Sequence, residues 1–201
     1  MNIYPRFLTP SECQVISKII IRDEKAVLRI PNDWINDYSG LTEQHTVYNW
    51  LNHEEIKPFN IPYRLHTQLA ELKDIPAISI QCWANIIRKG EDLMEHTHGT
   101  GTGKEPPFWA INIFLSGNPN TGTYFTERKE VYKNSIGELV IVDDTMLHGV
   151  YENVYDEPRI SLAVDVHVDE LRVQDCIRRS SEYKVHPDRF IISTKGSSHG
   201  G

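Results

Sequence analysis

The chain has 201 residues, 39% of them hydrophobic and 24% charged, which is the composition of a globular domain with a buried core. The formal net charge of −7 argues against a nucleic acid as partner, because binding a phosphate backbone requires a basic surface. No stretch approaches the ~20 consecutive apolar residues of a membrane-spanning helix, and the first residues lack the basic-then-apolar order of a signal peptide.

Two helices are predicted in the first third of the chain. Thr9 can cap a helix that begins at Pro10, with Glu12 completing a capping box, and apolar residues recur at helical spacing to about residue 22. Three leucines line one face of a second predicted helix over residues 63–72. The intervening residues 23–60 show no clear period and are expected to be irregular.

From residue 75 onward, short β-like runs separated by turn residues replace the helical pattern. Helices followed by many short strands predict a mainly β fold with flanking α-helices, arranged as a double-stranded β-helix, the jelly roll of cupin-like proteins. The predicted strands cover residues 78–87, 108–115, 122–125, 137–142 and 159–168.

The pattern indicates a single domain over residues 1–195, with the jelly-roll core at about 76–168. The glycine-rich segment 99–107 is expected to be a lid or a linker rather than a phosphate-binding loop, since no helix follows it. Residues 196–201 are expected to be a disordered tail, and an artificial extension. Three widely spaced cysteines make a poor disulfide framework, which favours a reducing, cytoplasmic location.

Three histidines in the β-like region could bind a metal ion. His96 and His98 are two residues apart, so on an extended strand both imidazoles face the same side, about 6–7 Å apart at Cα. His148 follows the predicted strand 137–142, where it can reach the mouth of a jelly roll that brings distant strands together. Neutral imidazoles on one face suit a first-row metal such as Fe(II).

Arg159 opens the next predicted strand, and Ser161 shares its face. A guanidinium can bind a carboxylate through two hydrogen bonds, and a neighbouring hydroxyl adds a third. A cation one strand beyond a metal ligand suits a keto acid that chelates the metal at one end and carries a carboxylate at the other. Each of these residues alone is more often structural, so the prediction depends on their combined order and spacing.

In this order the segments resemble the Fe(II)/2-oxoglutarate-dependent oxygenase superfamily, whose usual pattern is His-x-Asp/Glu, a distant His and then Arg-x-Ser. The resemblance covers residues 78–168: residues 83–90 and His96-Thr97-His98 match its first half, and residues 137–150 with Asn153 match its second. It implies that His96 and His148 bind iron and that Arg159 and Ser161 hold the distal carboxylate of 2-oxoglutarate. The further residues that it suggests for the cosubstrate pocket are Asn85, Asn112 and Tyr124.

Position 98 departs from this pattern, because a histidine stands where a carboxylate is usual. His98 could complete a three-histidine site, Glu95 or water could take the third position, or the position could be vacant as in the related halogenases. The size of a histidine argues against a halogenase. Three neutral ligands would leave more positive charge on the iron and should strengthen the binding of an anionic chelator. His98 is therefore included among the candidate metal ligands, and the identity of the third ligand stays open.

The resemblance implies a dioxygenase that uses O₂ and 2-oxoglutarate to hydroxylate a small molecule or a peptidyl side chain, with release of succinate and CO₂. Trp83 and Trp109 are expected to line the substrate cleft, and no catalytic residue is expected beyond the metal centre. Two alternatives stay open. One is a cupin-like three-histidine metal dioxygenase that needs no 2-oxoglutarate and would leave Arg159 without a role; the other is a non-enzymatic cupin-like binding domain.

Overall fold

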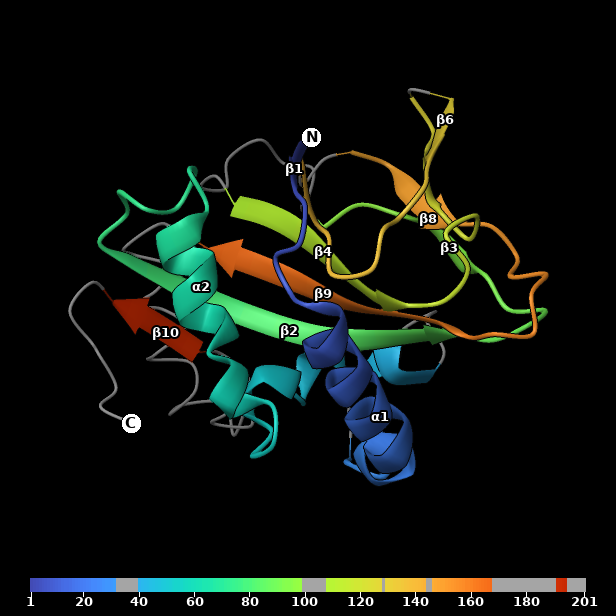
Figure 1. Cartoon of the computed structure of the whole chain (residues 1–201), viewed down its shortest axis with the longest axis horizontal. Helices are drawn as coiled ribbons and strands as arrows, with labels where there is room; N and C mark the ends of the chain where they lie inside the picture. Colours follow the sequence, from blue (N-terminus) through green and yellow to red (C-terminus); the bar gives the residue numbers. More distant parts are fainter. Residues whose placement is uncertain (32–39, 99–107, 128, 144–145, 168–190, 195–201) are drawn as a thin grey trace.

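The computed structural model describes residues 1–31, 40–98, 108–127, 129–143, 146–167 and 191–194. Within these ranges the chain forms two β-sheets whose strand pairs are antiparallel (Figure 1). In spatial order, the large sheet contains β1 (Asn2–Tyr4), β7 (Leu139–Asp143), β4 (Phe108–Ser116), β9 (Arg159–His167), β2 (Ala77–Ile87) and β10 (Ile191–Thr194). The small sheet contains β3 (Leu93–His96), β8 (His148–Val150), β5 (Thr123–Phe125) and β6 (Glu130–Tyr132).

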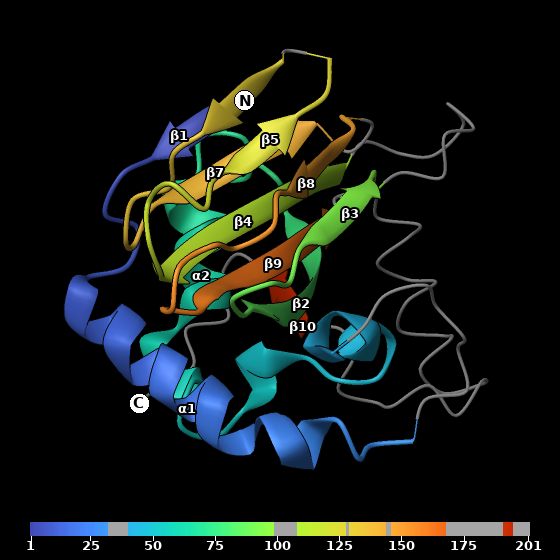
Figure 2. The same ribbon diagram turned by 90° about the vertical axis from the view of Figure 1, so that its right-hand side faces the viewer.

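The two sheets lie one in front of the other, with the helices on the outer side of the large sheet (Figure 2). This is the jelly-roll architecture that the sequence predicts. The helices are α1 (Pro10–Val27) and α2 (Ile61–Gln68), and three short 3₁₀ helices, η1 (Gly40–Thr46), η2 (Trp50–Asn52) and η3 (Lys57–Phe59), connect them.

The capping box at the start of α1 is confirmed. The Thr9 hydroxyl accepts a hydrogen bond from the Glu12 amide (3.3 Å), and the Glu12 carboxylate accepts one from the Thr9 amide (2.6 Å). The helix continues to Val27, five residues beyond the expected end, because buried Val27 extends its apolar face. The prediction that residues 23–60 are irregular is therefore wrong for the end of α1 and for the three 3₁₀ helices.

The second helix begins at Ile61, before the expected start, and ends at Gln68 rather than at residue 72. Pro62 suits its first turn, where no backbone donor is needed. Leu69 and Leu72 are fully buried although they lie past the end of the helix. Their apolar spacing thus reflects burial, and the sequence pattern extended the helix too far.

The side chains of β9 point alternately to the two faces of the large sheet, one facing the hydrophobic core and the other facing the small sheet. Ile160, Leu162, Val164 and Val166 are buried in the main hydrophobic core, which also contains the buried hydrophobic residues of α1 and α2. Arg159, Ala163 and Asp165 lie on the other face, toward the small sheet. Between the sheets, the apolar cluster of the described residues is small: it contains Ala110, Phe125, Val140 and Val142, with Tyr132 and Met146 packed against it.

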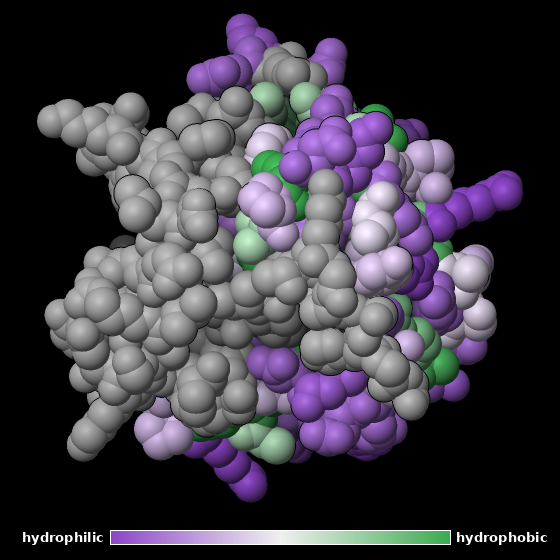
Figure 3. Space-filling model, turned by 90° about the vertical axis from the view of Figure 1, so that its left-hand side faces the viewer, coloured by the Kyte–Doolittle hydropathy of each residue, from purple (hydrophilic) through white to green (hydrophobic). Residues whose placement is uncertain are grey.

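None of the helices in the described ranges is long and apolar enough to span a membrane. On the face shown in Figure 3, the hydrophobic residues among those described form small separate areas between hydrophilic ones. The expected loop at residues 99–107 and the expected tail at residues 196–201 lie outside the described residues. The single domain over residues 1–195 stays a prediction.

Candidate active site

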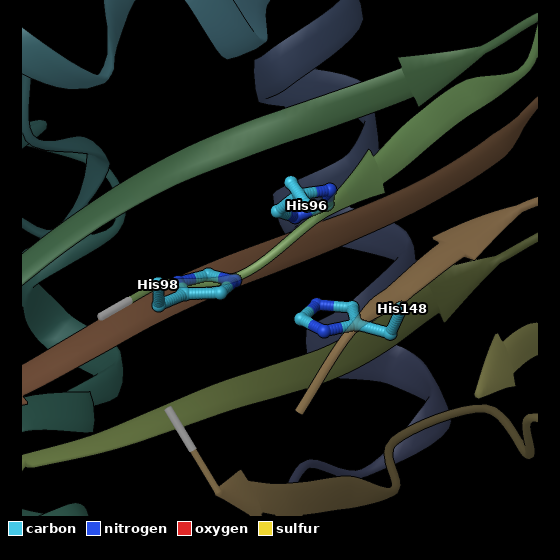
Figure 4. A group of neighbouring side chains, drawn as sticks. All are labelled: His96, His98 and His148. Atoms are coloured by element: carbon cyan, nitrogen blue, oxygen red, sulfur yellow. The ribbon is translucent and has the colours of Figure 1, made fainter. Parts of the chain in front are cut away.

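His96, His98 and His148 converge at one end of the small sheet (Figure 4). His96 ends β3 and lies directly opposite His148, the first residue of β8, while His98 follows two residues after His96. The ring centroids are 4.5 Å apart for His96 and His148, 5.2 Å for His98 and His148, and 5.3 Å for His96 and His98. One nitrogen of each ring lies within 4.8 Å of the other two, so the three imidazoles could share one metal ion.

Hydrogen bonds determine which nitrogen of each ring could bind the metal. Nδ1 of His96 lies 2.8 Å from the Met94 carbonyl oxygen, and Nδ1 of His148 lies 2.7 Å from that of Met146. Nδ1 of His98 lies 2.7 Å from a carboxylate oxygen of Asp165. Carbonyl and carboxylate oxygens only accept, so each Nδ1 must donate, and the lone pair is on Nε2. This tautomer is the one that metal-bound histidines usually adopt, so the residues fit a metal.

The surroundings of His96 and His148 favour the neutral form of these two rings. Burial and, to a smaller extent, the neighbouring His96 together lower the pKa of His148 to about 3. Burial also lowers the pKa of His96. Neutral imidazoles with an available lone pair are the form that binds first-row metals.

Glu95, the alternative third ligand, has a different environment. Its carboxylate is exposed and accepts a hydrogen bond from the Thr126 hydroxyl. It lines a separate pocket on the outer side of the small sheet. The geometry therefore favours His98 over Glu95 as the third ligand.

Arg159 is a buried cation, only 1% exposed. Its Nε donates to the Thr121 carbonyl (3.0 Å), Nη1 to the Ser161 hydroxyl (3.0 Å) and Nη2 to the Thr123 hydroxyl (3.3 Å). None of the ion pairs found among the described residues involves this guanidinium. Burial lowers the pKa of Arg159 to about 10, which leaves the side chain charged at neutral pH. Because an unpaired buried charge is costly, this environment suits an anionic ligand.

The three histidines and Arg159 line the same cavity, which lies between the two sheets and has a volume of about 170 Å³. Trp83, Asn85 and Asn112 line it as well, and their expected roles toward the cosubstrate and the substrate stay predictions. The Thr42 hydroxyl of η1 donates to the Asn85 side-chain oxygen (2.7 Å), so η1 forms one wall. Ser161 is fully buried and contributes by holding Arg159.

Two expected residues lie outside this cavity. On β5, Thr123 and Phe125 face the cavity, so the intervening Tyr124 faces outward, where its ring stacks on Tyr151 at 4.2 Å. On β4, Trp109 packs against the main hydrophobic core. The expectations that Tyr124 lines the cosubstrate pocket and that Trp109 lines the substrate cleft are therefore corrected.

Three residues of the site were missed from the sequence. Asp165 shares the face of Arg159 on β9, so the period of two could have indicated it. Thr123 holds Arg159 from another sheet. Asn134 lines the cavity from the segment after β6, is only 2% exposed, and its side-chain nitrogen has no hydrogen-bond partner in the described structure.

No family model matches the sequence, and no curated protein matches it significantly. Solved structures do match. HygX from Streptomyces hygroscopicus, with nickel, 2-oxoglutarate and hygromycin B bound, is 13% identical with a TM-score of 0.56, over 84% of this chain and 82% of that one. The nickel complex of ThoJ, a non-heme monooxygenase, is 14% identical with a TM-score of 0.57, over 83% and 73%. A prolyl-4-hydroxylase from Pseudomonas putida is 10% identical with a TM-score of 0.52, over 84% and 92%.

These likenesses establish the fold. The chain shares the jelly-roll fold of Fe/2-oxoglutarate-dependent oxygenases. In this chain, His96, His98 and His148 form a possible metal site within that fold.

Proposed function

We propose that the protein is a non-haem Fe(II)- and 2-oxoglutarate-dependent dioxygenase that hydroxylates a small molecule or a peptidyl side chain, with release of succinate and CO₂. The observation that carries the proposal is the combination in one cavity of three histidines suited to a metal and a buried guanidinium without a counter-charge among the described residues. A cosubstrate with a chelating keto acid at one end and a carboxylate at the other meets both requirements.

The histidines would hold Fe(II) through Nε2 of each ring. Their Nδ1–H groups are bound to Met94, Asp165 and Met146, so each ring is oriented before the metal arrives. When bound, the iron would supply the oxidising chemistry with 2-oxoglutarate and O₂. Since all three rings are neutral ligands, no atom bound to the ion would carry a full negative charge, which favours the binding of an anionic chelator compared with a site that has a carboxylate ligand.

Arg159 would hold the distal carboxylate of 2-oxoglutarate. Its three hydrogen bonds occupy three of the five guanidinium N–H groups, and the remaining two can donate to a ligand. Ser161 and Thr123 fix the orientation of the guanidinium, which reduces the entropy lost when the ligand binds. The Asn134 amide could donate to the same ligand, since a buried donor without a partner is costly.

The wall of the cavity would limit the access of water to the reacting groups. Phe125, Val140, Val142 and Val150 contribute apolar surface, and Trp83 covers His98. A low local dielectric strengthens the attraction between Arg159 and an anion. Orientation and exclusion of water, rather than acid–base chemistry, would be the contribution of the protein.

Anaerobic titration tests the proposal. Adding 2-oxoglutarate to the protein with Fe(II) should produce a weak metal-to-ligand charge-transfer band in the visible, and admitting O₂ with a substrate should release succinate. The three histidines would also suit a cupin-like metal dioxygenase that needs no 2-oxoglutarate. Substrate turnover without 2-oxoglutarate would establish that alternative, and iron binding without either response would indicate a binding domain.

A further inference from the structure

His98 is held differently from the other two histidines. The acceptors for His96 and His148 are neutral backbone carbonyls, each from the residue two positions earlier. The acceptor for His98 is a carboxylate from the opposite sheet, Asp165 on β9, at 2.7 Å. Among these three Nδ1 hydrogen bonds, that of His98 is the one made to a charged group.

Asp165 is well placed to orient a ring. It lies within β9, opposite Gln81 of β2 on one side and Ala110 of β4 on the other, so strand pairing on both sides fixes its backbone. Its side chain is 16% exposed, and that of His98 is 7% exposed. A hydrogen bond between two such shielded groups, one of them charged, is stronger than one at the surface.

The orientation of the His98 ring depends on contacts with other side chains. The residue lies beyond the end of β3, so the pairing of β3 with β8 does not fix its backbone. Its ring stacks on Trp83 (centroids 5.6 Å apart, 26° between planes) and lies nearly parallel to the ring of His148 (5.2 Å, 9°). Stacking fixes the plane of the ring, and the bond to Asp165 decides which nitrogen points toward the other histidines.

We propose that Asp165 is a positioning residue that makes His98 the third metal ligand. It holds His98 as the Nδ1–H tautomer, and it supplies from behind the imidazole the negative charge that a carboxylate ligand would bring directly. A carboxylate bound to Nδ1–H makes Nε2 a stronger donor, as in the carboxylate–histidine–metal arrangement of other metal sites. The inference rests on the metal site of the proposed function, but not on 2-oxoglutarate.

The first test compares Asp165→Asn and Asp165→Ala with the unchanged protein, using Ni(II) alone in a calorimetric titration. We expect nickel affinity to fall by about 10- to 100-fold, the usual effect of losing such an outer contact, with the alanine variant affected more because asparagine can still accept the hydrogen bond. Asp156→Asn is the matched control, since that side chain is 93% exposed and pairs with Lys89. Equal nickel affinity in all four proteins would overturn the proposal.

The second test places Asp165→Asn in a His98→Asp background. If Asp165 acts through the imidazole, Asp165→Asn should not weaken nickel binding there, and removal of a like charge could strengthen it. The same loss in both backgrounds would show that Asp165 affects the metal without His98, and would contradict the proposal.

A third readout needs no metal. Nitrogen NMR of the metal-free protein, with the His98 signals assigned by their loss in His98→Gln, should show the Nδ1–H tautomer in the unchanged protein. Asp165→Ala should shift His98 toward the Nε2–H form, while His148 keeps its tautomer. If His98 keeps the same tautomer in Asp165→Ala, the proposal is overturned, whatever the nickel affinities are. Failure of the 2-oxoglutarate experiments would leave these three results unaffected, so the two proposals can fail separately.

Discussion

His96 and His148 are register partners across β3 and β8, with their rings 4.5 Å apart. The pairing of two short strands therefore determines the distance between two of the three proposed ligands. Since the register of a strand pair cannot shift by one residue without turning its side chains to the other face, the metal site and the small sheet should form together.

His148→Ala should abolish metal binding, because it removes one of three ligands and the partner of His96. Nickel titration measures the effect. His53→Ala is the control, since His53 belongs with Asp23 and Glu55 to a second group of side chains close enough to hold an ion. That group is an ion-pair cluster with Arg22, and its loss should leave nickel affinity unchanged. If His53→Ala loses nickel binding and His148→Ala keeps it, the metal binds at that ion-pair cluster instead.

Arg159→Met should leave nickel affinity unchanged and weaken 2-oxoglutarate. A hydrogen bond to a charged group contributes about 1.5–3 kcal/mol, so affinity should fall by roughly 10- to 100-fold. Thermal unfolding with nickel provides the measurement: 2-oxoglutarate at 100 times its Kd should stabilise the unchanged protein by about 2.7 kcal/mol and the variant by much less. If 2-oxoglutarate stabilises both proteins equally, Arg159 does not bind the cosubstrate.

The sequence was most informative where function requires a local spacing. The spacing of two residues correctly predicted that the rings of His96 and His98 lie close together, although β3 ends at His96, and the same spacing on β9 places Ser161 beside Arg159. The period of two says which residues share a face, but not which face is inside. Tyr124 and Thr123 are neighbours on a strand of three residues, and the choice between them depends on the pairing of β5 with β8.

Contacts between segments that are distant in the sequence cannot be predicted from such spacing patterns. Asn134 reaches the cavity from the segment that joins the small sheet to the large one, and nothing in the adjacent residues marks it. The end of α2 was missed for a related reason, since Leu69 and Leu72 keep a helical apolar spacing while they pack into the core outside the helix. Both depend on how separate elements pack together.

Asn134→Leu should weaken 2-oxoglutarate without destabilising the metal-free protein. Its side-chain nitrogen is buried without a partner, so replacing it with an apolar group removes a cost rather than a bond. Asn153→Leu is the matched control: that fully buried amide donates to the carbonyls of Ile87 and Glu157, both at 3.0 Å. Its loss should lower the free energy of unfolding by about 1–3 kcal/mol, measured by urea denaturation. A comparable loss in Asn134→Leu would mean that its amide has a structural partner.

Thr123→Val and Tyr124→Phe compare two adjacent residues on opposite faces of β5. Thr123→Val removes the hydroxyl that accepts from Nη2 of Arg159, so the guanidinium should be less well oriented and 2-oxoglutarate should bind several-fold more weakly. Tyr124→Phe removes only the hydroxyl of a ring that stacks on Tyr151 outside the cavity, and should leave that affinity unchanged. Titration of both nickel-loaded variants with 2-oxoglutarate measures the difference. A weaker affinity in Tyr124→Phe alone would reverse the assignment of the two faces, and would return Tyr124 to the place in the pocket that the resemblance first suggested.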